Sequence, residues 1–225
     1  MTRNFVFSED EFYHIYNRGV DKRLVFLEKS DYKRFIALLY AANSDTPVRL
    51  RFNGHKAQGE TLPPLSEIQR GDTLVDIGAW CLMPNHFHIL IKEKQKDGIS
   101  LFMQKLLTGY SMYFNKKYER KGTLFDRPFK AKHLDTDNYL KYQYTYIHLN
   151  PIGIIESGWK EKKIKNKVEA KKFLLDYPYS SLQDYLGVKR EENVIIEPKA
   201  FPEYFETLTD FKDMIDEWIN FDPNL

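Results

Sequence analysis

Two histidines near the middle of the chain are spaced for joint metal binding. His86 and His88 flank Phe87 in a run whose hydrophobicity alternates as in a β-strand. Successive strand side chains point to opposite faces, so the two imidazoles share one face, roughly 6–7 Å apart. Imidazoles at that separation can bind one divalent cation, although a His-x-His pair on a strand often serves no metal. Metal chemistry therefore needs support from a second element.

A stripe of three tyrosines and one asparagine is a candidate for this second element. Residues 138–149 have helical periodicity and end before Pro151, which cannot continue a helix. Residues three or four apart share one helix face. The stripe consists of Tyr139, Tyr142, Tyr146 and Asn150. Such a stripe also suits packing against a core, so the spacing alone leaves its role open.

The remaining periodicity predicts the elements that position these side chains. The Pro84-Asn85 pair suits a tight turn and would place the histidines just past the turn of a hairpin. The expected strands span 11–19, 74–83, 86–94 and 123–132, and the expected helices span about 31–42, 100–118, 138–149 and 211–219. The segment 44–72 lacks periodicity and is predicted to be a long insertion, with room for a short strand at 48–52.

The composition indicates a soluble, intracellular protein. The chain has 225 residues, enough to bury the core of one domain. Its single cysteine, Cys81, excludes an intrachain disulfide and fits a reducing compartment, with a buried and inert thiol as the expected state. No signal peptide opens the chain, and no stretch approaches the ~20 apolar residues of a membrane helix. We therefore expect a cytoplasmic protein with no membrane partner.

The charge is uneven along the chain. Residues 191–225 carry ten acidic and two basic side chains, a charge of −8, which leaves +10 for residues 1–190. A basic body suits a polyanionic partner, although solvated surface charge explains it equally well. Aromatic and cationic residues also alternate within 123–132, which suits base stacking beside phosphate contacts. Core aromatics covered by lysine stems would give the same pattern.

Four segments form a specific combination of motifs. They are Tyr13-His14 with Asn17-Arg18-Gly19, Met83-Pro84-Asn85-His86-Phe87-His88, Gly122-Thr123-Leu124-Phe125-Asp126-Arg127-Pro128-Phe129-Lys130, and Tyr146-Ile147-His148-Leu149-Asn150-Pro151. Together they resemble the HUH transposases with one catalytic tyrosine, specifically the REP-associated tyrosine transposase branch. Order and spacing agree over about residues 10–155, and Ser180-Ser181 with Asp184-Tyr185 resembles a downstream segment. The insertion at 44–72 and the acidic C-terminal helix depart from the family pattern.

The resemblance implies an α+β, ferredoxin-like (RRM-like) catalytic domain at residues 1–155, with an antiparallel sheet backed by helices. It implies that His86 and His88 bind a divalent metal, Mg²⁺ or Mn²⁺, and that Asn150 matches the third ligand. It also implies that Tyr146 is the nucleophile. Apart from the resemblance, the lysines of 160–172 and the amphipathic spacing of 211–219 predict that residues 156–225 form a basic segment and an acidic helical extension packed on this domain.

The implied function is metal-dependent cleavage and rejoining of single-stranded DNA in transposition, through a 5′-phosphotyrosine at hairpin-flanked sites. Arg18, Arg127, Lys130 and Lys132 are the candidate DNA contacts. The alternative is a domesticated protein that binds structured DNA without transposing, and a third hypothesis is a hydrolase with an unrelated His-x-His metal site. The sequence leaves open whether a homodimer forms and whether the tyrosine serves its own subunit.

Overall fold

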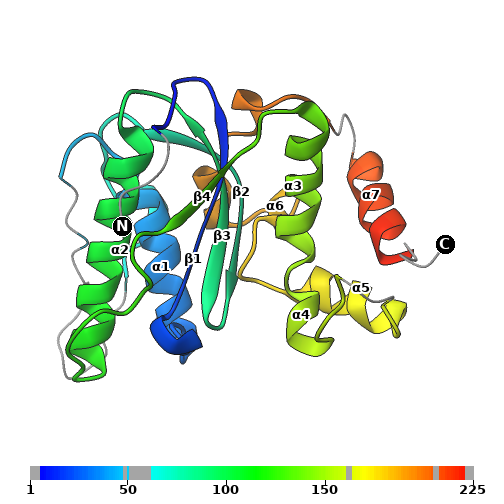
Figure 1. The fold of residues 1–225 in the computed structure, drawn as a ribbon, viewed down its shortest axis with the longest axis horizontal. Coiled ribbons are helices and arrows are strands. Elements are labelled where there is room, and N and C mark those ends of the chain that lie inside the picture. The colour runs from blue at the N-terminus through cyan, green and yellow to red at the C-terminus, as the bar shows by residue number, and fades with distance from the viewer. Residues whose placement is uncertain (1–5, 48–49, 51–61, 161–163, 205–207, 221–225) are drawn as a thin grey trace.

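Four segments with alternating hydrophobicity form one antiparallel sheet in the computed structural model of this chain (Figure 1). The strands are β1 (Phe12–Arg18), β2 (Val75–Met83), β3 (His86–Glu93) and β4 (Lys130–His133), in the spatial order β2-β3-β1-β4. The structure describes residues 6–47, 50, 62–160, 164–204 and 208–220. The predicted turn at Pro84-Asn85 joins β2 to β3, so the hairpin ends beside the first histidine.

Two long helices cover one face of this sheet (Figure 1). They are α1 (Lys29–Ala41) and α2 (Gly98–Lys117), and both contribute to the main hydrophobic cluster. Phe87, Ile89 and Ile91 of β3 point into that cluster and are fully buried, as their alternation predicts. The chain order β1-α1-β2-β3-α2-β4 with this strand order is the ferredoxin-like arrangement. The predicted α+β fold class is therefore confirmed.

The opposite face of the sheet is covered by α3 (Asp137–Leu149) (Figure 1). The Thr136 side chain caps this helix by accepting a hydrogen bond from the backbone N–H of Tyr139. The helix approaches β2 closely at Gly78, where the register of the strand shifts. A Cβ atom on Gly78 would lie 2.8 Å from the Tyr144 hydroxyl oxygen, so this approach requires glycine. The helix predicted for this segment is confirmed.

Among the described residues beyond α3, the chain forms four further helices. They are α4 (Ile152–Ile155), α5 (Lys167–Asp176), α6 (Leu182–Tyr185) and α7 (Leu208–Asn220), and short 3-10 turns occur at Val20–Lys22, Leu65–Glu67, Glu191–Ile195 and Pro198–Ala200. Apolar residues of the helices join Leu149, at the end of α3, in a second buried cluster. The Thr145 hydroxyl of α3 donates to the Met214 sulfur of α7 at 2.8 Å. This contact joins α7 to α3.

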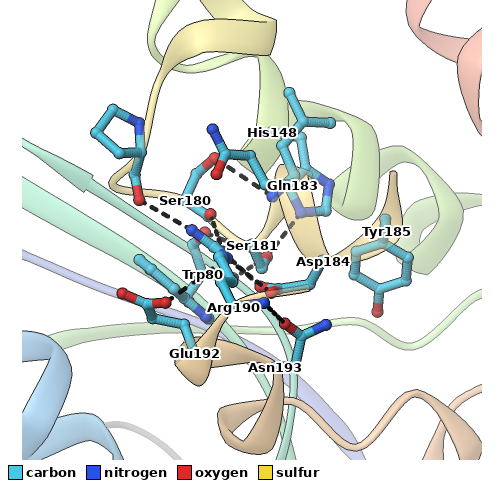
Figure 2. Close-up of polar contacts among 12 residues, drawn as sticks. Trp80, His148, Ser180, Ser181, Gln183, Asp184, Tyr185, Arg190, Glu192 and Asn193 are labelled. Atoms are coloured by element: carbon cyan, nitrogen blue, oxygen red, sulfur yellow. Dashed lines mark hydrogen bonds and ion pairs between the residues drawn. The ribbon is translucent and has the colours of Figure 1, made fainter. Parts of the chain in front are cut away.

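A return of the chain to β2 connects the sheet with α3 (Figure 2). The Ser181 N–H donates to the Trp80 carbonyl oxygen, and the Trp80 N–H donates to the Ser181 hydroxyl oxygen, each at 2.9 Å. The same hydroxyl oxygen lies 2.8 Å from Nε2 of His148, which belongs to α3. Ser181 and His148 are both fully buried. One serine therefore links a strand to the helix that packs on it.

Arg190 holds this returning segment in place (Figure 2). Its guanidinium donates to the Asp184 carboxylate and to the carbonyl oxygens of Pro178 and Ser180. A guanidinium with several acceptors in fixed directions restricts the backbone on either side of Ser181. The segment therefore presents its serine to the sheet in a defined geometry.

The fourth strand is shorter than the alternation predicts. Only Lys130–His133 pairs with β1, because the preceding residues enter the core or cannot join a ladder. Leu124 and Phe125 are buried in the main cluster, and Pro128 has no N–H to donate. The strand considered at 48–52 lies outside the described residues, apart from residue 50, which is not in a strand.

Other expectations have mixed outcomes. Within the insertion, Leu65 and Ile68 are buried in the main cluster, so its described end is part of the fold.

Cys81 is fully buried, as predicted, and burial raises the pKa of its thiol. In the part of the chain that the structure describes, no helix is long and apolar enough to cross a membrane. A domain boundary near residue 155 stays a prediction.

We expect Ser181→Ala to lower the free energy of unfolding by about 1–3 kcal/mol, because it leaves a buried imidazole nitrogen and a buried N–H without a partner. Urea unfolding followed by circular dichroism measures this loss. Ser66→Ala, at an exposed serine of the Leu65–Glu67 turn, is the matched control and should change stability by less than about 0.5 kcal/mol. Equal stability of the two variants would contradict the linking role of Ser181.

Candidate functional site

Three histidines meet on the sheet face that α3 covers. The register of β1 and β3 brings His14 beside His88, and His14 Nε2 lies 2.8 Å from His88 Nδ1. His86 shares this face, as predicted, and its ring centroid lies 5.1 Å from that of His88. The Nδ1 atom of His86 donates to the side-chain oxygen of Asn85 at 2.6 Å. The turn residue before β3 therefore orients the first histidine, and the neighbouring strand orients the second.

These contacts leave one nitrogen of each β3 imidazole available. Because His86 Nδ1 is the donor, its Nε2 carries the lone pair of a neutral ring. Nε2 of His88 is buried and has no hydrogen-bond partner among the described residues. Burial, followed by the charges of Arg18 and Lys160, lowers the pKa of His86 to about 4. Burial, followed by the neighbouring His14 and His86, lowers the pKa of His88 well below its usual range. Both rings are therefore neutral near neutral pH.

Helix α3 presents Tyr146 to these histidines. The centroid of its ring lies 5.6 Å from that of His88 and 5.9 Å from that of His14, both edge to face. Tyr142, one turn earlier, stacks on Tyr146. The Tyr146 hydroxyl oxygen accepts a hydrogen bond from Lys160 Nζ at 2.5 Å. The phenol therefore contacts a buried imidazole on one side and a cation at its oxygen.

A pocket of about 360 Å³ joins these groups. It is lined by Tyr16, Asn17, Arg18, Asp21, Lys22, His86, His88, Asp126, Lys130, Tyr146 and Lys160. Four cationic side chains face two carboxylates in this lining, which gives the pocket a net positive charge. Such a wall favours an anionic ligand of the size of a phosphate group.

The pocket collects part of the predicted site. His86, His88, Tyr146, Arg18 and Lys130 line it together. Arg127 lies instead on a separate groove between α2 and residues 122–129, and Lys132 is exposed on β4. The structure therefore separates the predicted DNA contacts into two that share the pocket and two that lie outside it.

Asn150 is not among the residues that line the pocket. It is the C-cap of α3 and is buried, and its Nδ2 donates to the carbonyl oxygen of Tyr146 at 2.7 Å. This contact closes the last turn of the helix that carries the tyrosine. The role of Asn150 as a ligand stays a prediction.

The histidine pair fits an open cation site. Two neutral imidazoles with free Nε2 atoms would hold an ion and leave its other positions to water or substrate oxygens. The contact of His14 with His88 Nδ1 is the kind that orients a ligating imidazole. Within the described residues, no group of three or more histidine, cysteine, aspartate or glutamate side chains can hold an ion.

The contacts of two site residues have no clear signal in the sequence. His14 belongs to one of the motifs and alternates onto the correct face of its strand, but only the pairing of β1 with β3 sets it beside His88. Lys160 is one of seven lysines between residues 160 and 172, so no spacing distinguishes it from the others. Each contact joins separate elements, 74 residues apart for His14 and His88 and 14 apart for Lys160 and Tyr146.

Known proteins share the sequence region and the fold that form this site. Residues 59–150 match the sequence model of the family described as "Transposase IS200 like". No curated protein matches the sequence. Among solved structures, the fold is similar to "Structure of the REP associates tyrosine transposase bound to a REP hairpin", with a TM-score of 0.50 and 14% sequence identity. The similarity covers 85% of this chain and 89% of that chain.

The matched region contains His86, His88, Tyr146 and Asn150, which carry two of the four motifs behind the predicted resemblance. The similar solved structure agrees with the ferredoxin-like arrangement of the sheet. The matched region of the sequence is therefore similar to IS200-like transposases, and the fold is similar to that of a solved REP-associated tyrosine transposase.

Proposed function

We propose that this chain is a metal-dependent endonuclease and strand transferase for single-stranded DNA, of the REP-associated tyrosine transposase branch. It cuts beside a DNA hairpin and holds the cut strand as a 5′-phosphotyrosine. The observation that carries the proposal is the contact between Tyr146 and His88 at the wall of a cation-rich pocket. The solved transposase of similar fold is bound to a REP hairpin, which supports a hairpin as the substrate.

Tyr146 is the proposed nucleophile. Its hydroxyl oxygen attacks the phosphorus of a phosphodiester, the P–O3′ bond breaks, and one strand leaves with a free 3′-hydroxyl. The phosphotyrosine conserves the energy of the broken bond, so another 3′-hydroxyl can attack it and join strands without ATP. Because the Tyr146 ring contacts His14 and His88 of its own chain, we propose that it acts within its own subunit.

His86 and His88 are the proposed ligands of Mg²⁺ or Mn²⁺, through the Nε2 atoms that their hydrogen bonds leave available. When bound, the cation supplies polarisation of the scissile phosphodiester and offsets charge that develops in the transition state. Asn150 is the proposed third ligand through its side-chain oxygen, since its side-chain nitrogen already donates to the Tyr146 carbonyl. His14 keeps the His88 ring in a fixed orientation.

The predicted DNA contacts divide into two groups. Arg18 and Lys130 line the pocket with the histidines, which supports contact with the phosphates of the reacting strand. Lys132 and Arg127 are exposed outside the pocket and are proposed to contact flanking DNA. Each phosphate contact should steepen the salt dependence of binding. The slope of the logarithm of the binding constant against the logarithm of the salt concentration changes by about one unit per contact.

We expect Tyr146→Phe to abolish the covalent protein–DNA adduct on single-stranded oligonucleotides that carry a hairpin. The substitution removes the attacking oxygen and keeps the ring, so the hairpin affinity should change by less than about fivefold. A denaturing gel after incubation with Mn²⁺ measures the adduct, and fluorescence anisotropy measures binding. Tyr142→Phe is the matched control because Tyr142 stacks on Tyr146, and this variant should keep the adduct.

Two outcomes of that experiment would contradict the proposal. An adduct that persists in Tyr146→Phe would assign the nucleophile to another tyrosine. A wild-type protein that binds the hairpin without forming an adduct would favour the alternative, a domesticated protein that recognises structured DNA.

Removal of the metal should stop cleavage. EDTA should abolish adduct formation and added Mn²⁺ should restore it, whereas full cleavage in EDTA would exclude a metal from the mechanism.

In calorimetric titration, His88→Ala should weaken Mn²⁺ binding by at least about tenfold. His133→Ala is the control, since His133 lies on β4 and pairs with Glu11. Unchanged Mn²⁺ affinity in Asn150→Ala would remove Asn150 from the ligand set.

A further inference from the structure

The hydroxyl of Tyr146 has a cationic partner from outside the region that matches the family. Lys160 Nζ donates to the Tyr146 oxygen at 2.5 Å and lies 4.3 Å from the centre of the Tyr146 ring. We propose that Lys160 is a catalytic residue whose ammonium group stabilises the Tyr146 phenolate, both as nucleophile and as leaving group. The inference rests on the proposed function, and the short contact assigns electrostatic support of the attacking oxygen to a residue beyond the matched segment 59–150.

The segment that carries Lys160 is anchored at the end of α3. Trp159 is buried in the second hydrophobic cluster, together with Leu149 and Ile152. Its ring also packs on Gly153 of α4, where a Cβ atom would lie 3.3 Å from the indole nitrogen. Figure 1 shows α4 directly after α3, beside the C-terminal end of that helix. A fixed tryptophan therefore sets the adjacent, exposed lysine within reach of the phenol.

The groups around the phenol favour an anion at its oxygen. The strands contribute the neutral rings of His14 and His88, and α3 contributes Tyr142. The charged groups that line the pocket with Lys160 are Arg18, Lys22, Lys130, Asp21 and Asp126. The positive charge of Lys160 also contributes to the lowered pKa values of His14, His86 and His88. The positive charge of Lys160 therefore acts on the region that contains the Tyr146 phenol.

The proposed step balances in protons and bonds. An unperturbed phenol ionises near pH ~10, so a tyrosine nucleophile needs help at neutral pH. The phenol proton passes to water, and Lys160 keeps its own proton and donates a charge-assisted hydrogen bond to the phenolate. Attack forms the bond from the tyrosine oxygen to phosphorus and breaks the P–O3′ bond, and the departing 3′-oxygen takes a proton from water. In rejoining, a 3′-hydroxyl loses its proton to water and attacks, and the phenolate leaves toward Lys160.

The first test follows the rate of adduct formation against pH in single-turnover reactions with a hairpin oligonucleotide and Mn²⁺. Lys160→Met should be slower on the order of 10²-fold near neutral pH, and its rate should rise toward the wild-type value as the pH approaches about 10. Lys160→Arg keeps the charge and should retain a rate within about tenfold of the wild type. Lys33→Met removes an exposed lysine of α1, on the opposite side of the sheet, and should leave the profile unchanged.

The second test separates catalysis from binding. Fluorescence anisotropy measures the affinity of each variant for the hairpin oligonucleotide. Lys160→Met should bind within about fivefold of the wild type, because its main contact in the structure is the Tyr146 phenol. Lys33→Met should bind as the wild type does.

The two measurements separate the inference from the proposed function. A wild-type rate in Lys160→Met, or a loss of rate that is the same at every pH and matches a loss of hairpin binding, would overturn the role of Lys160. A wild-type protein that forms no adduct would overturn the proposed function instead.

Discussion

The position of the tyrosine helix depends on a buried polar contact, in which the Ser181 hydroxyl joins His148 of α3 to the backbone of Trp80 in β2. The sheet face below this helix carries histidines beside apolar residues, and the apolar residues pack against Leu140, Tyr144 and Ile147 of the helix. A buried hydrogen bond restricts distance and direction together, and an unpaired donor there costs about 1–3 kcal/mol. Since His148 lies two residues beyond Tyr146, this contact also sets where the phenol meets the histidines.

The site combines neutral imidazoles with surrounding cations. Burial, followed by the charges of Lys132 and Lys160, lowers the pKa of His14 to about 3, and burial likewise lowers those of the two β3 histidines. A neutral ring keeps the lone pair that a metal needs. The positive charge of the pocket therefore belongs to lysine and arginine side chains, which suits contact with a phosphate. Ligation and anion binding thus use different residues within one small volume.

The sequence could predict what depends on local periodicity. The hairpin at Pro84-Asn85 and the shared face of His86 and His88 follow from alternation and turn chemistry, whereas the ferredoxin-like sheet is what the resemblance of the motifs implies. The extent of β4 could not be predicted, because Leu124 and Phe125 leave the alternating pattern to fill the core. Three contacts between elements could not be predicted either.

These contacts join elements that are far apart along the chain. His14 meets His88 through strand pairing, Ser181 meets His148 through a return of the chain, and Lys160 meets Tyr146 through the anchor of Trp159. Only tertiary packing brings such partners together, so no pattern within a single segment predicts them. The motif residues could therefore be identified from the sequence, whereas the contacts that orient them could not.

The return of the chain to β2 has a consequence for how small a working form of this protein can be. A shortened chain that stops near residue 155 would keep both β3 histidines and the tyrosine, and would look complete by its motifs. It would lack the serine that fastens the tyrosine helix and the lysine that touches the phenol. The shortest chain that keeps both contacts therefore extends at least through Arg190, which holds the segment that carries Ser181 in place.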